Sequence, residues 1–123
     1  MGFEYPVYLT DFPSEMASLA KIKIDEDGFQ VAARFELYIN GLELANAYDE
    51  LADSTEQSRR FASDNTERQQ RGLPVVPVDQ YLIAALDHFP PCAGIALGLD
   101  RLLMVILETT RIDQVISFPA AIA

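Results

Sequence analysis

Cysteine and histidine are almost absent from this sequence, and tryptophan is missing altogether. The 123 residues include one cysteine, Cys92, and one histidine, His88. A single cysteine cannot form an internal disulfide, which suits a reducing compartment. One cysteine and one histidine cannot build a zinc site of the usual kind. A hydrolase triad would have to recruit His88, and no nucleophile elbow accompanies it.

Positive charge and long apolar runs are also scarce. Nine lysine and arginine residues stand against nineteen aspartate and glutamate residues, which gives a formal net charge of −10. Such an acidic surface repels phosphate backbones, so general nucleic-acid binding is disfavoured. The longest apolar run covers residues 102–107, far short of the roughly 20 residues that cross a bilayer. Because no targeting segment is visible either, we expect a soluble, cytoplasmic chain.

The remaining composition is that of a folded domain. Half of the residues are apolar and 23% are charged, which is enough apolar material for a modest core. The local patterns predict, in order, a strand, a hairpin, two helices, a strand and a helix. This order indicates an α+β fold, with an antiparallel sheet and flanking helices segregated to one side of it.

The hairpin is the clearest local feature. Asn40 and Gly41 are expected to form its turn, because a type I′ turn needs positive φ at both positions. Alternating residues predict strands over 4–10, 32–39, 42–51 and 93–99. Shorter features are expected at 14–19 (a helical turn), 25–28 (an acidic turn) and 114–118 (a strand or tail).

Three helices are expected after the hairpin, the first over residues 54–71. Their predicted start and stop signals are a Ser54–Gln57 capping box, Gly72, Asp79, Pro90-Pro91 and Asp100. The third helix, starting at Arg101, is expected to be buried.

Two carboxylates share one face of the hairpin. A two-residue turn pairs Tyr38 with Glu43 and Glu36 with Ala45. Glu36 and Glu43 then become diagonal neighbours, roughly 7–8 Å apart at the backbone. Such carboxylates repel each other unless a cation lies between them, and Mg²⁺ carrying nucleotide phosphates is the natural candidate. The alternative, two solvated glutamates, is favoured by pattern alone.

The second strand of the hairpin carries Asn46, Tyr48 and Glu50, on the opposite face from Glu43 if alternation is strict. These side chains could hold a substrate ammonium group by hydrogen bonding, cation–π contact and charge. The alternative is ordinary solvent exposure on an edge strand, and the pattern of these three residues alone favours it.

A later strand has almost no side chains on one face, where Gly94, Ala96 and Gly98 fall. A flat ring could lie directly on this backbone. Arg101, at the start of the next helix, could stack on a purine or reach a phosphate. Close packing of a helix would also explain the small residues.

Taken together, these residues resemble the C-terminal part of a class II aminoacyl-tRNA synthetase catalytic domain. Residues 94–101 look like motif 3 of that class, and residues 35–46, FELYINGLELAN, look like its lysyl branch. Ala45 and Ala96 stand where lysyl-tRNA synthetases carry glycine. The chain is therefore more similar to the paralogous family of elongation factor P–(R)-β-lysine ligases. The resemblance runs from about Tyr5 to Phe118.

The resemblance implies an ATP-dependent ligase that activates lysine or (R)-β-lysine as an adenylate and transfers it to a lysine of elongation factor P. A protein acceptor makes tRNA an unexpected partner, which suits the acidic charge. The residues implied to bind ATP are Glu36, Glu43, Gly98 and Arg101, with Mg²⁺ on Glu36 and Glu43 and Arg101 catalytic. The residues implied to line the amino-acid pocket are Asn46, Tyr48, Glu50, Gly94 and Ala96, with Glu50 facing an ammonium group.

Some positions depart from the family. Ala47 and Asp49 replace a glycine and a histidine, so that Ala47 could crowd the pocket and Asp49 adds a charge. The tail, residues 119–123, lacks the usual acidic and basic residues. Motif 1, which forms the dimer interface, and motif 2, which supplies an arginine, should precede residue 1. Residues 1–123 are thus expected to be the C-terminal portion of a homodimeric enzyme, inactive alone and with uncovered apolar sheet surface.

The family uses Glu43 and Asn46 in one site, whereas strict alternation puts them on opposite faces. A β-bulge or strand twist near Leu44-Ala45 is therefore predicted. Two other functions stay open. The chain could be a piece of a lysyl-tRNA synthetase, against which Ala45 and Ala96 argue. It could also be a non-catalytic truncated paralogue that binds a nucleotide, an amino acid or a partner protein.

Overall fold

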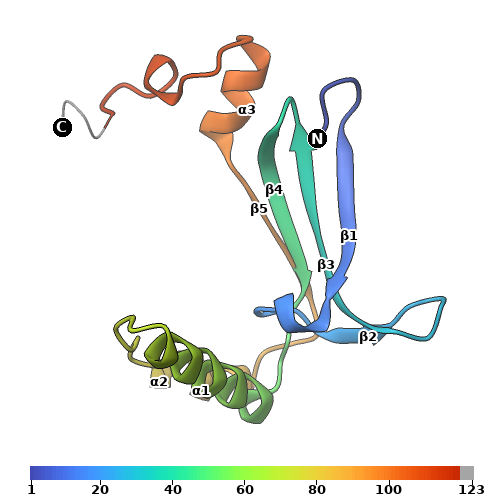
Figure 1. The fold of residues 1–123 in the computed structure, drawn as a ribbon, viewed down its shortest axis with the longest axis vertical. Helices are drawn as coiled ribbons and strands as arrows, with labels where there is room; N and C mark the ends of the chain where they lie inside the picture. Colours follow the sequence, from blue (N-terminus) through green and yellow to red (C-terminus); the bar gives the residue numbers. More distant parts are fainter. Residues whose placement is uncertain (120–123) are drawn as a thin grey trace.

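The computed structural model describes residues 1–119, which build one antiparallel sheet with helices beyond its ends (Figure 1). The strands are β1 (Val7–Pro13), β2 (Ile22–Ile24), β3 (Gln30–Ile39), β4 (Leu42–Asp49) and β5 (Ala93–Leu97). Their order is β1-β3-β4-β5, and the short β2 pairs with the first residues of β3. The predicted α+β class with an antiparallel sheet is confirmed.

The helices lie at opposite ends of the strands. They are α1 (Ser54–Gln70), α2 (Gln80–Leu86) and α3 (Leu99–Ile106), with 3₁₀ turns η1 (Ser14–Met16) and η2 (Ile112–Gln114). Helices α1 and α2 lie together beyond one end of the sheet, and α3 lies at the other end near the hairpin tip (Figure 1). The predicted flanking helices are thus present, and they lie beyond the two ends of the strands. None of the helices in residues 1–119 is long and apolar enough to span a membrane.

The predicted hairpin turn is confirmed. Asn40 and Gly41 have φ angles of 50° and 80°, and Ile39 pairs directly with Leu42. Both turn residues thus adopt the positive φ that a type I′ turn requires. A Cβ on Gly41 would lie 3.0 Å from the Phe3 ring, so a larger residue would have to displace this exposed ring in addition to adopting positive φ.

The predicted β-bulge is also present, and it corrects one predicted pair. Tyr38 pairs with Glu43 as expected, but the next pair along the ladder is Leu37 with Ala45, which leaves Leu44 as the extra residue of β4. Glu36 consequently pairs with Asn46, not with Ala45. Because one inserted residue reverses the alternation beyond it, Glu43 and Asn46 share a face.

A small core lies where η1 folds against the sheet. Phe12, Ala17 and Ala32 are buried together, with Ile22 packed against them. The helical turn expected at 14–19 is confirmed as η1, and the turn at 25–28 is held by the Asp25 carboxylate, which accepts two backbone N–H groups at 2.8 and 3.0 Å. Strand β2 was not predicted, since its three residues form a strand only by pairing with β3.

The start of α1 differs from the prediction. Asp53 is the N-cap, and its carboxylate accepts a hydrogen bond from the Glu56 backbone N–H at 2.9 Å. Ser54 is already helical, so the predicted Ser54–Gln57 capping box is wrong, and Gln57 is buried instead. Gly72 follows the helix with a φ of 69°, as expected of the residue after a C-cap.

The remaining boundaries need smaller corrections. Asp79 caps α2 as predicted, but α2 ends at Leu86, before Pro90. Helix α3 starts two residues earlier than expected, with Gly98 as its N-cap and Asp100 inside its first turn, and it buries only Met104. Residue 114 belongs to η2, and no strand follows it within the described residues. The predicted tail beyond Pro119 lies outside the described part of the chain.

Candidate functional site

One face of the sheet collects the residues singled out in the sequence. On β3 and β4, Glu36 is opposite Asn46 and Tyr38 is opposite Glu43. On β4 and β5, Asn46 is opposite Ala96 and Tyr48 is opposite Gly94. Because paired residues lie on the same face, the bulge brings Glu36, Glu43, Asn46 and Tyr48 together over the bare strand of Gly94 and Ala96.

Arg101 lies at one end of this face and is tied to the bulge. Its Nη1 donates a hydrogen bond to the Glu43 carbonyl oxygen at 2.7 Å, and the Gly98 N–H donates to the Leu44 carbonyl oxygen at 2.8 Å. A cavity of about 340 Å³ opens here. Its lining includes Glu43, Asn46, Ala96, Gly98 and Arg101, together with Asp100 and Ile112, which the sequence did not indicate as site residues.

Glu50 lies at the other end and is folded onto Gly94. A Cβ on Gly94 would overlap the Glu50 Oε1 atom, closer than any ordinary contact. The Glu50 N–H also donates to the Cys92 carbonyl oxygen at 3.0 Å, which fastens the end of β4 beside the start of β5. Gly94 therefore makes room for a carboxylate at the end of the face, and its φ lies outside the left-handed region.

Glu36 is held by two neighbours that the sequence patterns did not single out. One carboxylate oxygen pairs with Arg34 Nη2, and the other accepts a hydrogen bond from the Tyr38 hydroxyl at 2.7 Å. The side chains of Arg34 and Glu36 are only 10% and 14% exposed. The bond to Glu36, then desolvation and the negative charges of Glu36 and Glu43, raise the pKa of Tyr38, so the phenol remains a proton donor.

Arg34 is fixed on several sides. Its Nη1 donates to the Met16 carbonyl oxygen at 3.1 Å, and its guanidinium carbon lies 4.2 Å from the Phe12 ring centroid and 5.2 Å from that of Tyr48. Its Nε is buried without an acceptor among residues 1–119, a cost of about 1–3 kcal/mol that the other contacts must offset. Sequence spacing gave no sign of this arrangement, because Met16 and Phe12 come from η1 and β1.

The face offers two carboxylates to a cation, Glu36 and Glu43. No group of three or more aspartate, glutamate, histidine or cysteine side chains that could hold a metal occurs within the described residues. Two carboxylates fit Mg²⁺ that is also bound by phosphates and water, but not a cage made by protein alone. Although both Glu36 oxygens are engaged, a carboxylate has about four lone-pair positions, so Glu36 can still serve as a ligand.

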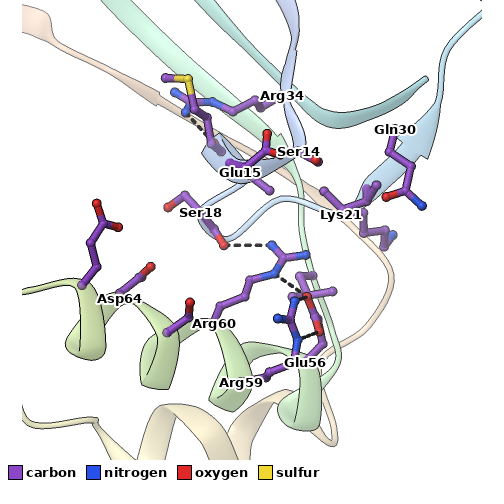
Figure 2. Close-up of a pocket in the computed structure, with 16 residues that line it drawn as sticks. Ser14, Glu15, Ser18, Lys21, Gln30, Arg34, Glu56, Arg59, Arg60 and Asp64 are labelled. Carbon is purple, nitrogen blue, oxygen red and sulfur yellow. Dashed lines mark hydrogen bonds and ion pairs between the residues drawn. The ribbon is translucent and has the colours of Figure 1, made fainter.

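A larger cavity of about 1000 Å³ lies elsewhere, between η1, β2 and α1. Figure 2 shows Arg59 and Arg60 meeting Glu56 on α1, and Arg60 reaching Ser18. The Arg59 hydrogen bond first, and the Arg60 bond next, lower the pKa of Glu56 to about 2. The cations of α1 are thus engaged within the protein, and of the residues predicted for the site none lines this cavity. We regard it as a structural junction.

The two departures from the family pattern lie away from the candidate face. Ala47 pairs with Phe35 and Ile95, which places it on the opposite face, so the expectation that it could crowd the pocket is wrong. The Asp49 carboxylate accepts a hydrogen bond from Lys21 Nζ at 2.6 Å. The added charge therefore pairs β4 with the segment before β2.

Two comparisons with known proteins, one with a family model and one with individual relatives, identify the same family. A family model for class II tRNA synthetases (D, K and N) matches residues 2–122. The chain is 48% identical over 124 residues to the elongation factor P–(R)-β-lysine ligases of Yersinia pestis (strain Pestoides F) and Yersinia pseudotuberculosis (serotype O:1b, strain IP 31758). Each alignment covers 100% of this chain but 38% of the relative, so the chain spans well under half the length of these curated relatives.

Proposed function

The chain belongs to the class II tRNA synthetase family, and from this premise we propose that it is the C-terminal portion of the catalytic domain of a lysine-type ligase, located in the cytoplasm. In the intact enzyme, the carboxylate of lysine or (R)-β-lysine would attack the α-phosphorus of ATP and release pyrophosphate. A lysine amine of elongation factor P would then attack the acyl carbon and release AMP. The named relatives, at 48% identity, support this choice of substrates.

The observation that carries the proposal is the single face created by the Leu44 bulge. A carboxylate pair, Glu36 and Glu43, lies on it near Arg101, and the Glu50 carboxylate lies at its far end over Gly94. A lysine isomer carries an ammonium group at the end of its side chain, which the Glu50 carboxylate would attract, whereas ATP carries phosphates that Arg101 and a cation on Glu36 and Glu43 would bind. Charge complementarity of this kind orients a substrate.

In the nucleotide half, Glu36 and Glu43 would bind Mg²⁺ on the ATP phosphates. When bound, Mg²⁺ would neutralise charge on the phosphates. Arg101 would stack over the adenine and contact the phosphates, with Gly98 beneath the ring. Its anchoring to the Glu43 carbonyl oxygen at 2.7 Å supports this role, because a guanidinium already oriented loses less entropy on binding.

In the amino-acid half, Glu50 would bind the substrate ammonium group, with Asn46 and Tyr48 beside it. Gly94 and Ala96 would form the floor. Ala96 lies on the candidate face, opposite Asn46, and its methyl group would trim the space beside the substrate's α-carbon. The alternative of a lysyl-tRNA synthetase fragment predicts no preference for the β-isomer. Ala45, the other distinguishing residue, pairs with Leu37 and Leu97 on the opposite face.

We expect binding, but little catalysis, from these 123 residues. The motif 2 arginine that the family resemblance implies is not recognisable among them, and loss of one such donor at a transition state costs about 3–4 kcal/mol. ATP–pyrophosphate exchange on the chain, with L-lysine and (R)-β-lysine in parallel, should therefore be silent. Robust exchange, with host enzymes excluded, would contradict this expectation, and the preferred isomer would name the branch.

Binding itself is tested by titrating the ¹⁵N-labelled chain with each lysine isomer and with Mg-ATP. We expect lysine to shift amide resonances of Asn46, Tyr48 and Glu50, and Mg-ATP to shift those of Glu43, Gly98 and Arg101. Ornithine, one methylene shorter, is the control for pocket length. Shifts scattered over the whole surface, or none at millimolar ligand, would contradict the proposal and favour a partner-binding module.

A further inference from the structure

Arg34 contacts a residue from each half of the proposed site. Its Nη2 pairs with the Glu36 carboxylate, and its guanidinium carbon lies 5.2 Å from the Tyr48 ring centroid. In the proposed function, Glu36 belongs to the nucleotide half and Tyr48 to the amino-acid half. Since the Arg34 side chain is 10% exposed, it has little surface of its own for a ligand. Any effect it has on binding would therefore pass through these neighbours.

The anchors of Arg34 lie outside both halves. The Met16 carbonyl oxygen, 3.1 Å from Nη1, belongs to η1, and the Phe12 ring, 4.2 Å from the guanidinium carbon, belongs to the buried core. A planar guanidinium can donate in its plane and stack on rings at the same time, whereas a lysine ammonium group cannot. These contacts tie the candidate face to the core beneath η1.

We propose that Arg34 is a positioning residue that couples the two halves, by holding the Glu36 carboxylate and the Tyr48 ring in one arrangement. The roles of Glu36 and Tyr48 rest on the proposed function, but the coupling between them can be tested without any ligand. A substitution at Glu36 should alter the environment of the Tyr48 ring through Arg34. Replacement of the guanidinium should abolish this effect.

The first test compares NMR spectra of the unliganded chain. The E36Q substitution should shift the Tyr48 ring resonances in the unsubstituted background and leave them unmoved in an R34K background. Y38F is the matched control, because it removes the other hydrogen bond to Glu36 while Arg34 stays in place, and it should preserve the response. An equal response of Tyr48 to E36Q in both backgrounds would overturn the proposal.

A second measurement needs no substitution and covers the case in which R34K does not fold. The unsubstituted chain should show nuclear Overhauser contacts from the Arg34 side chain to the rings of both Phe12 and Tyr48. Its Arg34 side-chain protons should also be shifted upfield by these rings. Absence of the contacts to Tyr48 would overturn the proposal.

The last test measures affinity. R34K should weaken both Mg-ATP and lysine, each by roughly 10-fold, the loss typical when a residue that orients a ligating group is changed. R59K is the matched control, because Arg59 also pairs its guanidinium with a glutamate, Glu56, but lies on α1, outside both halves. Weaker binding of only one of the two ligands would overturn the proposal that Arg34 couples the two halves. Failure of the unsubstituted chain to bind either ligand would count against the proposed function, while the unliganded spectra still decide the coupling.

Discussion

Glu43 and Asn46 lie three positions apart on β4 and yet share one face of the sheet. Each is opposite a residue of the same β3 face, Glu43 opposite Tyr38 and Asn46 opposite Glu36. Leu44, the extra residue between them, is buried with 2% of its surface exposed. The bulge therefore serves two purposes: it turns two polar side chains to the same side, and it packs a leucine into the interior.

Deletion of Leu44 should remove the bulge and still leave both halves of the site on one face. Without Leu44, Glu43 and Asn46 lie two positions apart, and regular alternation puts such residues on the same face, with Asn46 still opposite Glu36. We therefore expect the Glu36–Asn46 cross-strand contact to persist in NMR spectra, while the lost burial lowers the free energy of unfolding by about 2–5 kcal/mol. L44A is the matched control, because it keeps the bulge and should show the same contact. Loss of the contact in the deletion variant alone would contradict this account.

The sequence predicted this face better than it predicted the contacts behind it. The Asn40-Gly41 turn follows from local φ requirements, and the bulge from the need to bring Glu43 and Asn46 together. The pairing of Glu36 with Ala45 was wrong because it assumed an uninterrupted ladder beyond the turn. Local spacing predicts turns and alternation, but it does not show where an extra residue interrupts a strand. Here the bulge could be placed only because Glu43 and Asn46 were expected to share one site.

Arg34 and β2 show the other limit of sequence patterns. The partners of Arg34 come from β1, η1 and β4, so no spacing along β3 could reveal them. Strand β2 has three residues and exists through its pairs with β3. The N-cap of α1 was misassigned by one residue, since Asp53 and Ser54 are both good N-caps, and only the observed hydrogen bond to Glu56 decides between them.

Gly94 and Gly98 form a matched pair for testing the two halves. A Cβ on Gly94 overlaps Glu50 Oε1, whereas a Cβ on Gly98 meets nothing nearer than the Arg101 Cδ at 3.5 Å. G94A should keep the fold, because the end of a flexible side chain can move, but it should displace the Glu50 carboxylate and weaken lysine binding by roughly 10-fold or more. Lysine titrations followed by NMR measure this effect.

G98A should leave lysine binding unchanged, since its new methyl group makes only an ordinary van der Waals contact near Arg101. Any loss of affinity in G98A should be confined to Mg-ATP. If G94A bound lysine as well as the unsubstituted chain does, Glu50 would not be the ammonium-binding group.

Acid should weaken the start of α1 in a defined pH range. The bonds from Arg59 and then Arg60 lower the pKa of Glu56 from 4.5 to about 2. An unfolded chain binds this proton more readily than the folded one, so the pair stabilises the fold above about pH 4.5, and this contribution is lost as the pH falls through about 2. Helicity followed by circular dichroism should decline over this range, and E56Q should flatten that part of the profile.

E67Q is the control for this experiment, because it removes a carboxylate from the same helix without touching the Arg59–Glu56–Arg60 cluster. Since the cluster is partly solvent-exposed, added salt should reduce the effect. A profile for E56Q that overlays the profile of the unsubstituted chain would show that Glu56 contributes nothing to acid stability.

The opposite face of the sheet should drive self-association of the chain. Tyr8, Ile95 and Leu97 share this face, because their partners are Leu37, Ala47 and Ala45, and their exposed fractions are 61%, 66% and 45%. Contiguous exposed apolar surface favours association, and β5 adds a sheet edge of small residues with few charges to block pairing. Light scattering should therefore show a mass that rises with protein concentration. I95K should reduce this rise, because it places a charge on the exposed apolar face along the edge strand β5. Y81K, on the exposed side of α2, adds the same charge elsewhere and should have a smaller effect.

A chain that stays monomeric at high concentration would contradict this prediction. It would mean that the apolar side chains of this face pack against one another within a single molecule, as Tyr8 and Phe35 already do in an edge-to-face contact at 5.5 Å.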